Sequence, residues 1–249
     1  MLFNEGSTLY QGRVTIRLSG QPVAVDLGEG KFTRIAGCER EDHQTVLPVS
    51  LGPHESLVLL FDAEAYKNSQ PPFVARQSLD LDGGWSAKIV RHHRVGAHNY
   101  EIEENKTSSF QPITLGSWNE LVGADFSGVV AYRHKVKLPE SWLGKRLRIQ
   151  LGKVDYSAKV LVNDRDLGIA QWSPMEIEFS SDTSNPEFDL LIEVANTLAN
   201  ELTSERVKQE WSQRKGLGWP GPYHARAIEF EKDSRSGGLF GPVKIELSD

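Results

Sequence analysis

The sequence has almost no cysteine, because Cys38 is the only one among 249 residues. A single thiol cannot form an internal disulfide, and it cannot supply the several cysteine ligands of a typical structural zinc site. A chain of this length can bury a hydrophobic core large enough to fold without such cross-links. We therefore predict a fold held by hydrophobic packing, with Cys38 as a small core residue and with no cofactor.

Long hydrophobic runs and a basic leader are also missing. The longest apolar run covers residues 57–61, far short of the roughly 20 residues of a membrane-spanning helix. The first ten residues include Asn4 and Glu5 and have neither a basic start nor an apolar stretch, so they do not resemble a signal peptide. We expect a soluble protein with no membrane partner, and the compartment stays open.

Basic residues are not in excess. The chain has 28 Lys and Arg against 34 Asp and Glu, a formal net charge of −6 at pH 7. No large positive field therefore attracts phosphate backbones, and nucleic acid is not an expected partner. With 39% hydrophobic and 25% charged residues, the composition is that of an ordinary folded domain.

Several catalytic signatures are absent from the sequence. It contains no Gly-x-Ser-x-Gly, no Walker loop and no His-Glu-x-x-His, so hydrolase-elbow, phosphoryl-transfer and zinc-protease chemistry have no local support. Residues 216–221 match Gly-x-Gly-x-x-Gly, but Pro220 and Pro222 obstruct the helix that a dinucleotide site requires. Three histidines lie close together in the sequence: His92, His93 and His98. Their spacing does not match that of a zinc site, and it predicts a solvated basic loop.

What the chain does have is a repeated alternation of apolar and polar residues between glycine and proline turns. This pattern is typical of half-buried antiparallel strands. A single segment favours a helix, capped by Thr203 or Ser204 and ending at Gly216. We expect 56–61 to be a strand buried on both faces. The predicted strands cover 13–18, 23–27, 47–51, 56–61, 85–89, 130–138, 147–151, 158–162, 175–179, 188–194 and 243–247.

The periodicity stops between residues 63 and 78, where Pro71 and Pro72 lie in polar surroundings. Such a stretch is typical of a linker. We therefore predict an all-β protein in three parts. Residues 1–62 are predicted to form a small β-sandwich unit of four or five strands, and residues 63–78 are predicted to be a linker. Residues 79–249 are predicted to form a larger jelly-roll sandwich with one short helix.

Aromatic residues in the predicted loops are candidates for a binding surface. A flat ring beside hydrogen-bonding side chains suits a sugar, which has apolar faces and a rim of hydroxyls. The competing interpretation is that these rings close the ends of the sandwich or pack against another domain. The candidate sugar-binding residues are Trp118, Asn119, Trp211, Trp219, Tyr223 and His224.

A glycosidase needs one carboxyl group to protonate the leaving oxygen and another to attack or to activate water. Glu176 and Glu178 alternate with apolar residues and predict the wet face of a strand. Asp164 and Asp166 predict a hairpin turn. Loop carboxylates that could serve as acid and base or nucleophile are Glu120, Asp125 and Asp155.

A set of short segments resembles the galactose-binding-like β-sandwich domains attached to large glycoside hydrolases. The resemblance is strongest for the accessory domains of family 106 α-L-rhamnosidases and looser for the sugar-binding domain of family 2 β-galactosidases and β-glucuronidases. It covers about residues 79–247, and 47–57 is similar to the β domain that precedes such a module. The segments are 115–118, 126–132, 151–154, 160–163, 167–168, 172–174, 194–197 with Asn200, and 238–243.

In those families the catalytic groups lie on a separate barrel of about 250 residues, and two β domains leave no room for one. The resemblance thus implies a non-catalytic carbohydrate-binding or scaffolding module, equivalent to the C-terminal region of a rhamnosidase-like glycoside hydrolase. Its expected partner is a plant polysaccharide or oligosaccharide. Two alternatives stay open: a compact glycoside hydrolase, and a domain that docks a separately encoded glycosidase catalytic chain.

Overall fold

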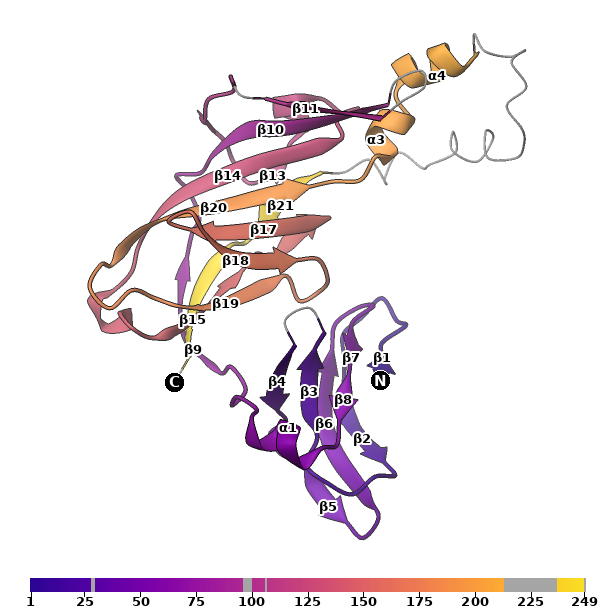
Figure 1. Ribbon diagram of the computed structural model, residues 1–249, viewed down its shortest axis with the longest axis vertical. Coiled ribbons are helices and arrows are strands. Elements are labelled where there is room, and N and C mark those ends of the chain that lie inside the picture. The colour runs from indigo at the N-terminus through magenta and orange to yellow at the C-terminus, as the bar shows by residue number, and fades with distance from the viewer. Residues whose placement is uncertain (28–29, 96–99, 106, 213–236, 249) are drawn as a thin grey trace. The chain divides into compact units, whose positions relative to one another are not determined.

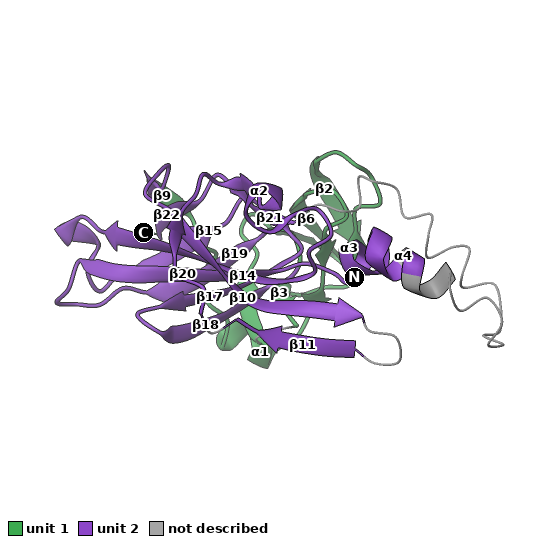
Figure 2. Cartoon of the chain, turned by 90° about the horizontal axis from the view of Figure 1, so that it is seen from above, with its two compact units in different colours: residues 1–76, 172–174, 248–249 green, residues 77–171, 175–247 purple. Residues whose placement is uncertain are grey.

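The computed structural model describes residues 1–27, 30–95, 100–105, 107–212 and 237–248 (Figure 1). Within these ranges the named strands pair antiparallel and the helices are short, which confirms the predicted all-β sandwich class. The chain divides into two compact units (Figure 2). Unit 1 contains residues 1–76 with 172–174 and 248–249, and unit 2 contains residues 77–171 and 175–247.

Unit 1 is made of three small sheets. Its core is formed by alternate residues of one strand, Leu47, Val49 and Leu51, as the sequence alternation predicts. The sheets are β1 (Leu2–Phe3) with β7 (Ser56–Leu57); β2 (Tyr10–Ile16), β6 (Gln44–Leu51) and β5 (Glu39–Glu41); and β4 (Lys31–Arg34), β3 (Val23–Asp26) and β8 (Leu59–Leu60).

The expectation for residues 56–61 was wrong. The segment divides into β7 and β8, which pair with different strands, and each of its residues is half-buried or exposed. An apolar run predicts a doubly buried strand only where a second layer covers its other face. Cys38 is also only half-buried, although it does pack against the core of unit 1.

The segment 63–78, expected as a linker, carries regular structure. It begins with α1 (Ala63–Lys67), whose first turn is capped by Asp62: its carboxylate accepts from the Ala65 N–H at 2.9 Å. Gln70 then pairs with β4, donating to the Phe32 carbonyl and accepting from the Arg34 N–H, each at 2.9 Å. The chain therefore stays packed on unit 1 past residue 62.

Unit 2 is a sandwich built around one seven-stranded sheet, here the long sheet. Its order is β11 (Tyr100–Glu104), β10 (Ser86–Val95), β14 (Gly128–Lys137), β20 (Glu187–Ala195), β17 (Ser157–Val162) and β18 (Arg165–Ala170), with β12 (Gln111–Pro112) beside β10. The remaining sheets are β19 (Glu176–Ser180), β15 (Arg146–Gln150), β22 (Lys244–Ser248) and β9 (Ala75–Asp80), and β13 (Gly116–Ser117), β21 (Gly238–Gly241) and β16 (Lys153–Asp155).

Among the described residues of unit 2, one apolar cluster fills the space between these layers. Ile149 of β15, Ile192 of β20 and Ile245 of β22 belong to it, and none of them has exposed surface. Tyr132 of β14 joins the layers, because its hydroxyl accepts from the Leu239 N–H of β21 at 3.3 Å. Burial raises the pKa of Tyr132 to about 12, so the phenol stays neutral within the core.

More helices occur than the one predicted. Besides α1 there are α2 (Asn119–Val122), α3 (Ala199–Leu202), α4 (Glu205–Ser212) and a 3₁₀ turn, η1 (Glu140–Trp142). Helices α1 to α3 have five residues or fewer, too few to show a helical period in the sequence. The predicted cap is confirmed for α4, since the Val207 N–H donates to Ser204 Oγ at 3.3 Å. The predicted end at Gly216 lies outside the described residues.

Helix length also bears on membranes. Across the described ranges, no helix combines the length and the apolar character needed to span a bilayer.

Candidate functional site

One end of unit 2 gathers the connections that follow β13 and β20. These are residues 117–127 and 196–204, called below the α2–α3 end; Figure 1 shows α3 where β20 ends. Asn196 ties the two connections together, donating to the Phe126 carbonyl at 2.9 Å and accepting from the Gly128 N–H at 2.8 Å. Asn200 adds a bond to the Ala124 carbonyl at 3.1 Å. The loops at this end are therefore fixed to each other by buried and half-buried amides.

Trp118 lies inside this end. Its ring has no exposed surface and meets Phe126 edge-on, with ring centroids 5.6 Å apart. A Cβ at Gly237 would lie 2.3 Å from the indole nitrogen, so only glycine permits this approach. The interpretation in which the ring closes the end of the sandwich describes Trp118, because a sugar has no access to its face in this arrangement.

The other candidate sugar-binding residues are placed differently. Asn119 is exposed at the start of α2, and its N–H donates to Ser117 Oγ at 3.3 Å. Trp211 lies in α4, and its side chain is outside what the structure describes. Trp219, Tyr223 and His224 lie outside the described residues, as does the Gly-x-Gly-x-x-Gly segment. The structure thus brings Trp118 and Asn119 to one end and leaves the remaining candidates as expectations.

A buried carboxylate that the sequence did not single out lies in the same place. Glu201 has a side chain 5% exposed; its Oε1 accepts from the Val95 N–H at 3.2 Å and from Arg206, and its Oε2 lies 4.0 Å from His92 Nε2. These contacts connect α3 with β10 and α4. Its one sequence signal, an acidic residue shortly after a strand, is too common to identify it.

His92 and His93 do not lie in a loop, contrary to the prediction, and His98 lies outside the described residues. Both belong to β10, where His92 pairs with Glu103 and His93 with Ile102 of β11. Burial, aided by nearby arginines, lowers the pKa of both histidines, and for His92 the Glu201 carboxylate opposes this shift. Both rings are therefore neutral at pH 7. In the described part of the chain, no three His, Cys, Asp or Glu side chains gather to hold a metal ion.

The predicted wet face of β19 is instead an ion-pair ladder. Arg148 bonds Glu246 at 2.6 Å and Glu176 at 3.1 Å, and Arg146 bonds Glu178 at 2.6 Å. Burial raises the pKa of Glu176, which the Arg148 charge partly offsets. These carboxylates cross-link β19, β15 and β22, and they are committed to structure.

The loop carboxylates of the alternative hypothesis lie at the same end of unit 2. Glu120 and Asp125 are exposed residues of the α2–α3 end. Asp155 is half-buried at the end of β16, and it pairs through Gly238 with Ser117 of β13. Lys153 lies 3.9 Å from the Asp155 carboxylate. The structure therefore gathers three carboxylates of which two are open to solvent.

Comparisons with known proteins identify the fold. No family model and no curated protein matches the sequence. Among solved structures, a rhamnosidase from Novosphingobium sp. PP1Y is similar over 98% of this chain and 22% of its own, with a TM-score of 0.67 and 22% identity. A β-glucuronidase from an uncultured Clostridium sp. is similar over 70% of this chain and 29% of its own, with a TM-score of 0.43 and 20% identity.

The chain therefore shares its fold with a part of the Novosphingobium rhamnosidase. It spans about a fifth of the length of the rhamnosidase that it resembles.

Proposed function

We propose that this chain is a carbohydrate-binding or scaffolding module equivalent to the non-catalytic C-terminal region of a rhamnosidase-like glycoside hydrolase. The observation that carries the proposal is the extent of the structural similarity. It covers 98% of the chain, and so includes both units, while using only 22% of the rhamnosidase. Because a fold alone does not confer activity, the chemistry of the α2–α3 end is the second support.

The α2–α3 end is the proposed sugar-contacting surface. Asn119 presents an exposed amide, which can donate to one hydroxyl and accept from another. Trp118 and Phe126 are buried at the same end and support this surface. A rigid surface favours binding because it loses little conformational freedom when the ligand binds. Trp211, Trp219, Tyr223 and His224 complete the proposal as the residues that supply aromatic faces and further hydrogen bonds.

The proposed ligand is a plant polysaccharide or oligosaccharide, and the proposed protein partner is a glycosidase catalytic domain. No catalytic residue is assigned in this role. A surface with exposed amides and aromatic rings suits uncharged sugars, since neither group demands a charged ligand.

Calorimetric titration with L-rhamnose, D-galactose and plant polysaccharides tests this function. We expect saturable binding to at least one of them, weakened about tenfold by Asn119→Ala or Trp219→Ala, which corresponds to about 1.4 kcal/mol. Matched controls are Gln11→Ala, an exposed amide in unit 1, and Trp172→Ala, an 81% exposed indole outside the candidate set. Absence of binding to every sugar would leave only a structural role.

The compact glycoside hydrolase stays the second candidate, because the structure brings Glu120, Asp125 and Asp155 to one end of unit 2. An assay with aryl glycosides, on the wild type and on Glu120→Gln, Asp125→Asn and Asp155→Asn, separates the two functions. Hydrolysis abolished by one of these amides supports the enzyme. Hydrolysis that no amide changes, or no hydrolysis at all, supports the non-catalytic module.

A further inference from the structure

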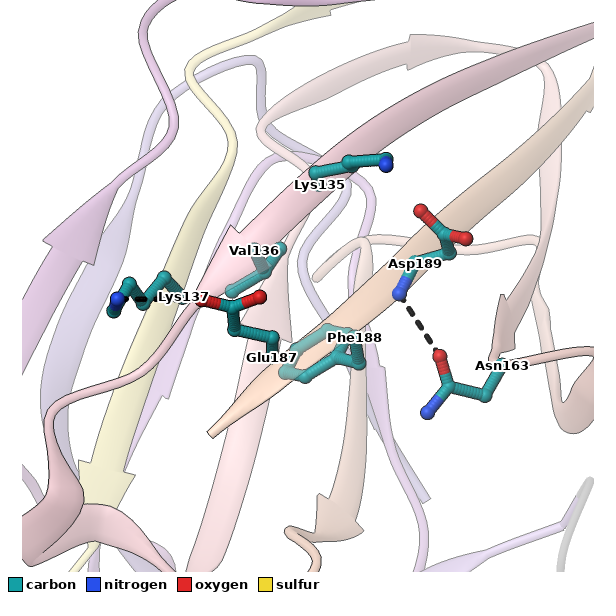
Figure 3. Close-up of a pocket in the computed structure, with 7 residues that line it drawn as sticks. All are labelled: Lys135, Val136, Lys137, Asn163, Glu187, Phe188 and Asp189. Carbon is teal, nitrogen blue, oxygen red and sulfur yellow. Dashed lines mark hydrogen bonds and ion pairs between the residues drawn. The ribbon is translucent and has the colours of Figure 1, made fainter. Parts of the chain in front are cut away.

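A second polar region lies toward the opposite end of the long sheet. A pocket of about 360 Å³ opens there beside β14, β20 and the β17–β18 turn (Figure 3). Lys135 is seven residues along β14 from Gly128 at the α2–α3 end, about 23 Å at the rise of a strand. This pocket, called the Asn163 pocket, is therefore separate from the surface proposed above. The side chains that matter are Lys135, Lys137, Asn163, Glu187 and Asp189.

Two lysine–acid pairs face each other across β14 and β20 in this pocket. Lys137 lies opposite Glu187, and Lys135 lies opposite Asp189, on the same face because they alternate with buried residues. The first pair is closed, with Lys137 Nζ 3.2 Å from Glu187 Oε1. The second is open: within the described structure, neither the Lys135 ammonium nor the Asp189 carboxylate has an ion pair or a hydrogen bond.

Asn163 is held rigidly beside the open pair. It begins the β17–β18 turn with φ 46°, followed by Asp164 with φ 62°, the left-handed conformations of a two-residue hairpin turn. Its N–H donates to the Asp189 carbonyl at 3.0 Å, and its Oδ1 accepts from the Asp189 N–H at 2.9 Å. Figure 3 shows the amide nitrogen turned away from this contact. The two amide protons are left available for a ligand.

The charges of the pocket disfavour a ligand with charge of a single sign. Lys135 and Lys137 balance Glu187 and Asp189, so an anion meets two carboxylates and a cation meets two ammonium groups. The open groups instead offer a carboxylate and an ammonium on β20 and β14, which accept and donate, and an amide on the β17–β18 turn, which donates. Adjacent hydroxyls, which donate and accept at once, satisfy both kinds of group.

We propose that the Asn163 pocket binds a neutral polyhydroxylated ligand, namely one ring of a sugar. Asp189 accepts hydrogen bonds from two neighbouring hydroxyls, while the Asn163 amide and the Lys135 ammonium donate to hydroxyl oxygens. The volume lies within the range of small-ligand sites. A second pocket of about 350 Å³ shares Asn163 and Glu187 and continues toward Asp182 and Asn185, which gives a longer saccharide a path along the surface.

The test is an NMR titration of the ¹⁵N-labelled full chain with L-rhamnose, D-galactose and D-glucose. We expect saturable shifts of the Asn163 side-chain amide and the Asp189 backbone amide with at least one sugar. Asp189→Asn and Lys135→Gln each weaken binding about tenfold, since a hydrogen bond to a charged group is lost. The matched control is Glu193→Gln, on the same strand and face but outside the pocket.

Controls on the ligand complete the design. Glycerol and sodium glucuronate bind more weakly than the neutral hexoses, because one lacks the ring and the other adds a charge. The proposal is overturned if no neutral sugar shifts the Asn163 or Asp189 amides, or if Asp189→Asn titrates like the wild type. Shifts confined to Asn119 would support the function proposed above and contradict this second site, so the two proposals fail separately.

Discussion

The two ends of the long sheet use polar residues in opposite ways. At the α2–α3 end, Glu201 and Asn196 are spent on holding loops together, and Trp118 is fully buried beneath them. At the Asn163 pocket, the Lys135 ammonium and the Asp189 carboxylate are exposed and have no ion pair or hydrogen bond among the described residues. We therefore expect substitutions at the α2–α3 end to change mainly the stability of the fold, and substitutions at the Asn163 pocket to change mainly the affinity for a ligand.

The largest expected effect is that of Trp118→Ala. Removing a fully buried indole leaves a cavity against Phe126, so we expect a loss of about 3–5 kcal/mol in the free energy of unfolding, measured by chemical denaturation of the full chain. Trp172→Ala is the control, because this indole is 81% exposed and its loss should change stability by less than about 0.5 kcal/mol. Equal effects of the two substitutions would contradict the buried position of Trp118.

Glu201→Gln comes next. The amide keeps the size of the side chain but lacks the negative charge that Arg206 and the Val95 N–H contact. We therefore expect the free energy of unfolding to fall by about 1–3 kcal/mol. Glu120→Gln makes the same chemical change on an exposed residue of the same end. If the denaturation midpoints of Glu201→Gln and Glu120→Gln coincide, the contacts of Glu201 do not stabilise the α2–α3 end.

The strands of this fold could be predicted, because their alternation is written in neighbouring residues. Ile149, Ile192 and Ile245 all occupy predicted inward positions, and all are fully buried. Helices α1 to α3 could not be predicted, since each has about one turn and depends on local caps such as Asp62. Residues 56–61 misled for a related reason, as apolarity alone does not show whether a second layer covers the strand.

The candidate site could be predicted only in part. Trp118 was placed correctly in a connection after a strand, but its burial depends on Gly237, far along the chain. The Glu201–Val95 bond joins residues 106 apart, and the Asn163–Asp189 bond joins residues 26 apart. Such pairs come from strand register and crossover, which a single sequence does not specify.

A smaller effect is expected from pH. His92 has an ordinary pKa of 6.5 that burial and Arg94 lower, despite Glu201 and Glu103, and the pKa of the neighbouring His93 is lowered as well. A base with a lowered folded pKa binds protons more tightly when unfolded, so stability is full above pH 6.5 and falls as the pH drops below it. The free energy of unfolding, measured by denaturation at about pH 7 and about pH 5, should decline less with falling pH in His92→Gln than in the wild type. A steeper decline in that variant would contradict the assignment.

The smallest stability effects are expected at the Asn163 pocket. Lys135→Gln and Asp189→Asn alter exposed groups without protein partners, so each should change the free energy of unfolding by less than about 0.5 kcal/mol. The measurement is the same denaturation experiment used for Trp118→Ala. A loss above about 1 kcal/mol would mean that the open pair is structural, and it would remove the contrast between the two ends.

Binding of carbohydrate without hydrolysis is tested most directly by titrating the full chain with a rhamnose-containing oligosaccharide while backbone amides and free sugar are followed together. We expect saturable shifts that include Asn119 and no release of monosaccharide. Release of rhamnose, or the absence of any saturable shift, would contradict this expectation.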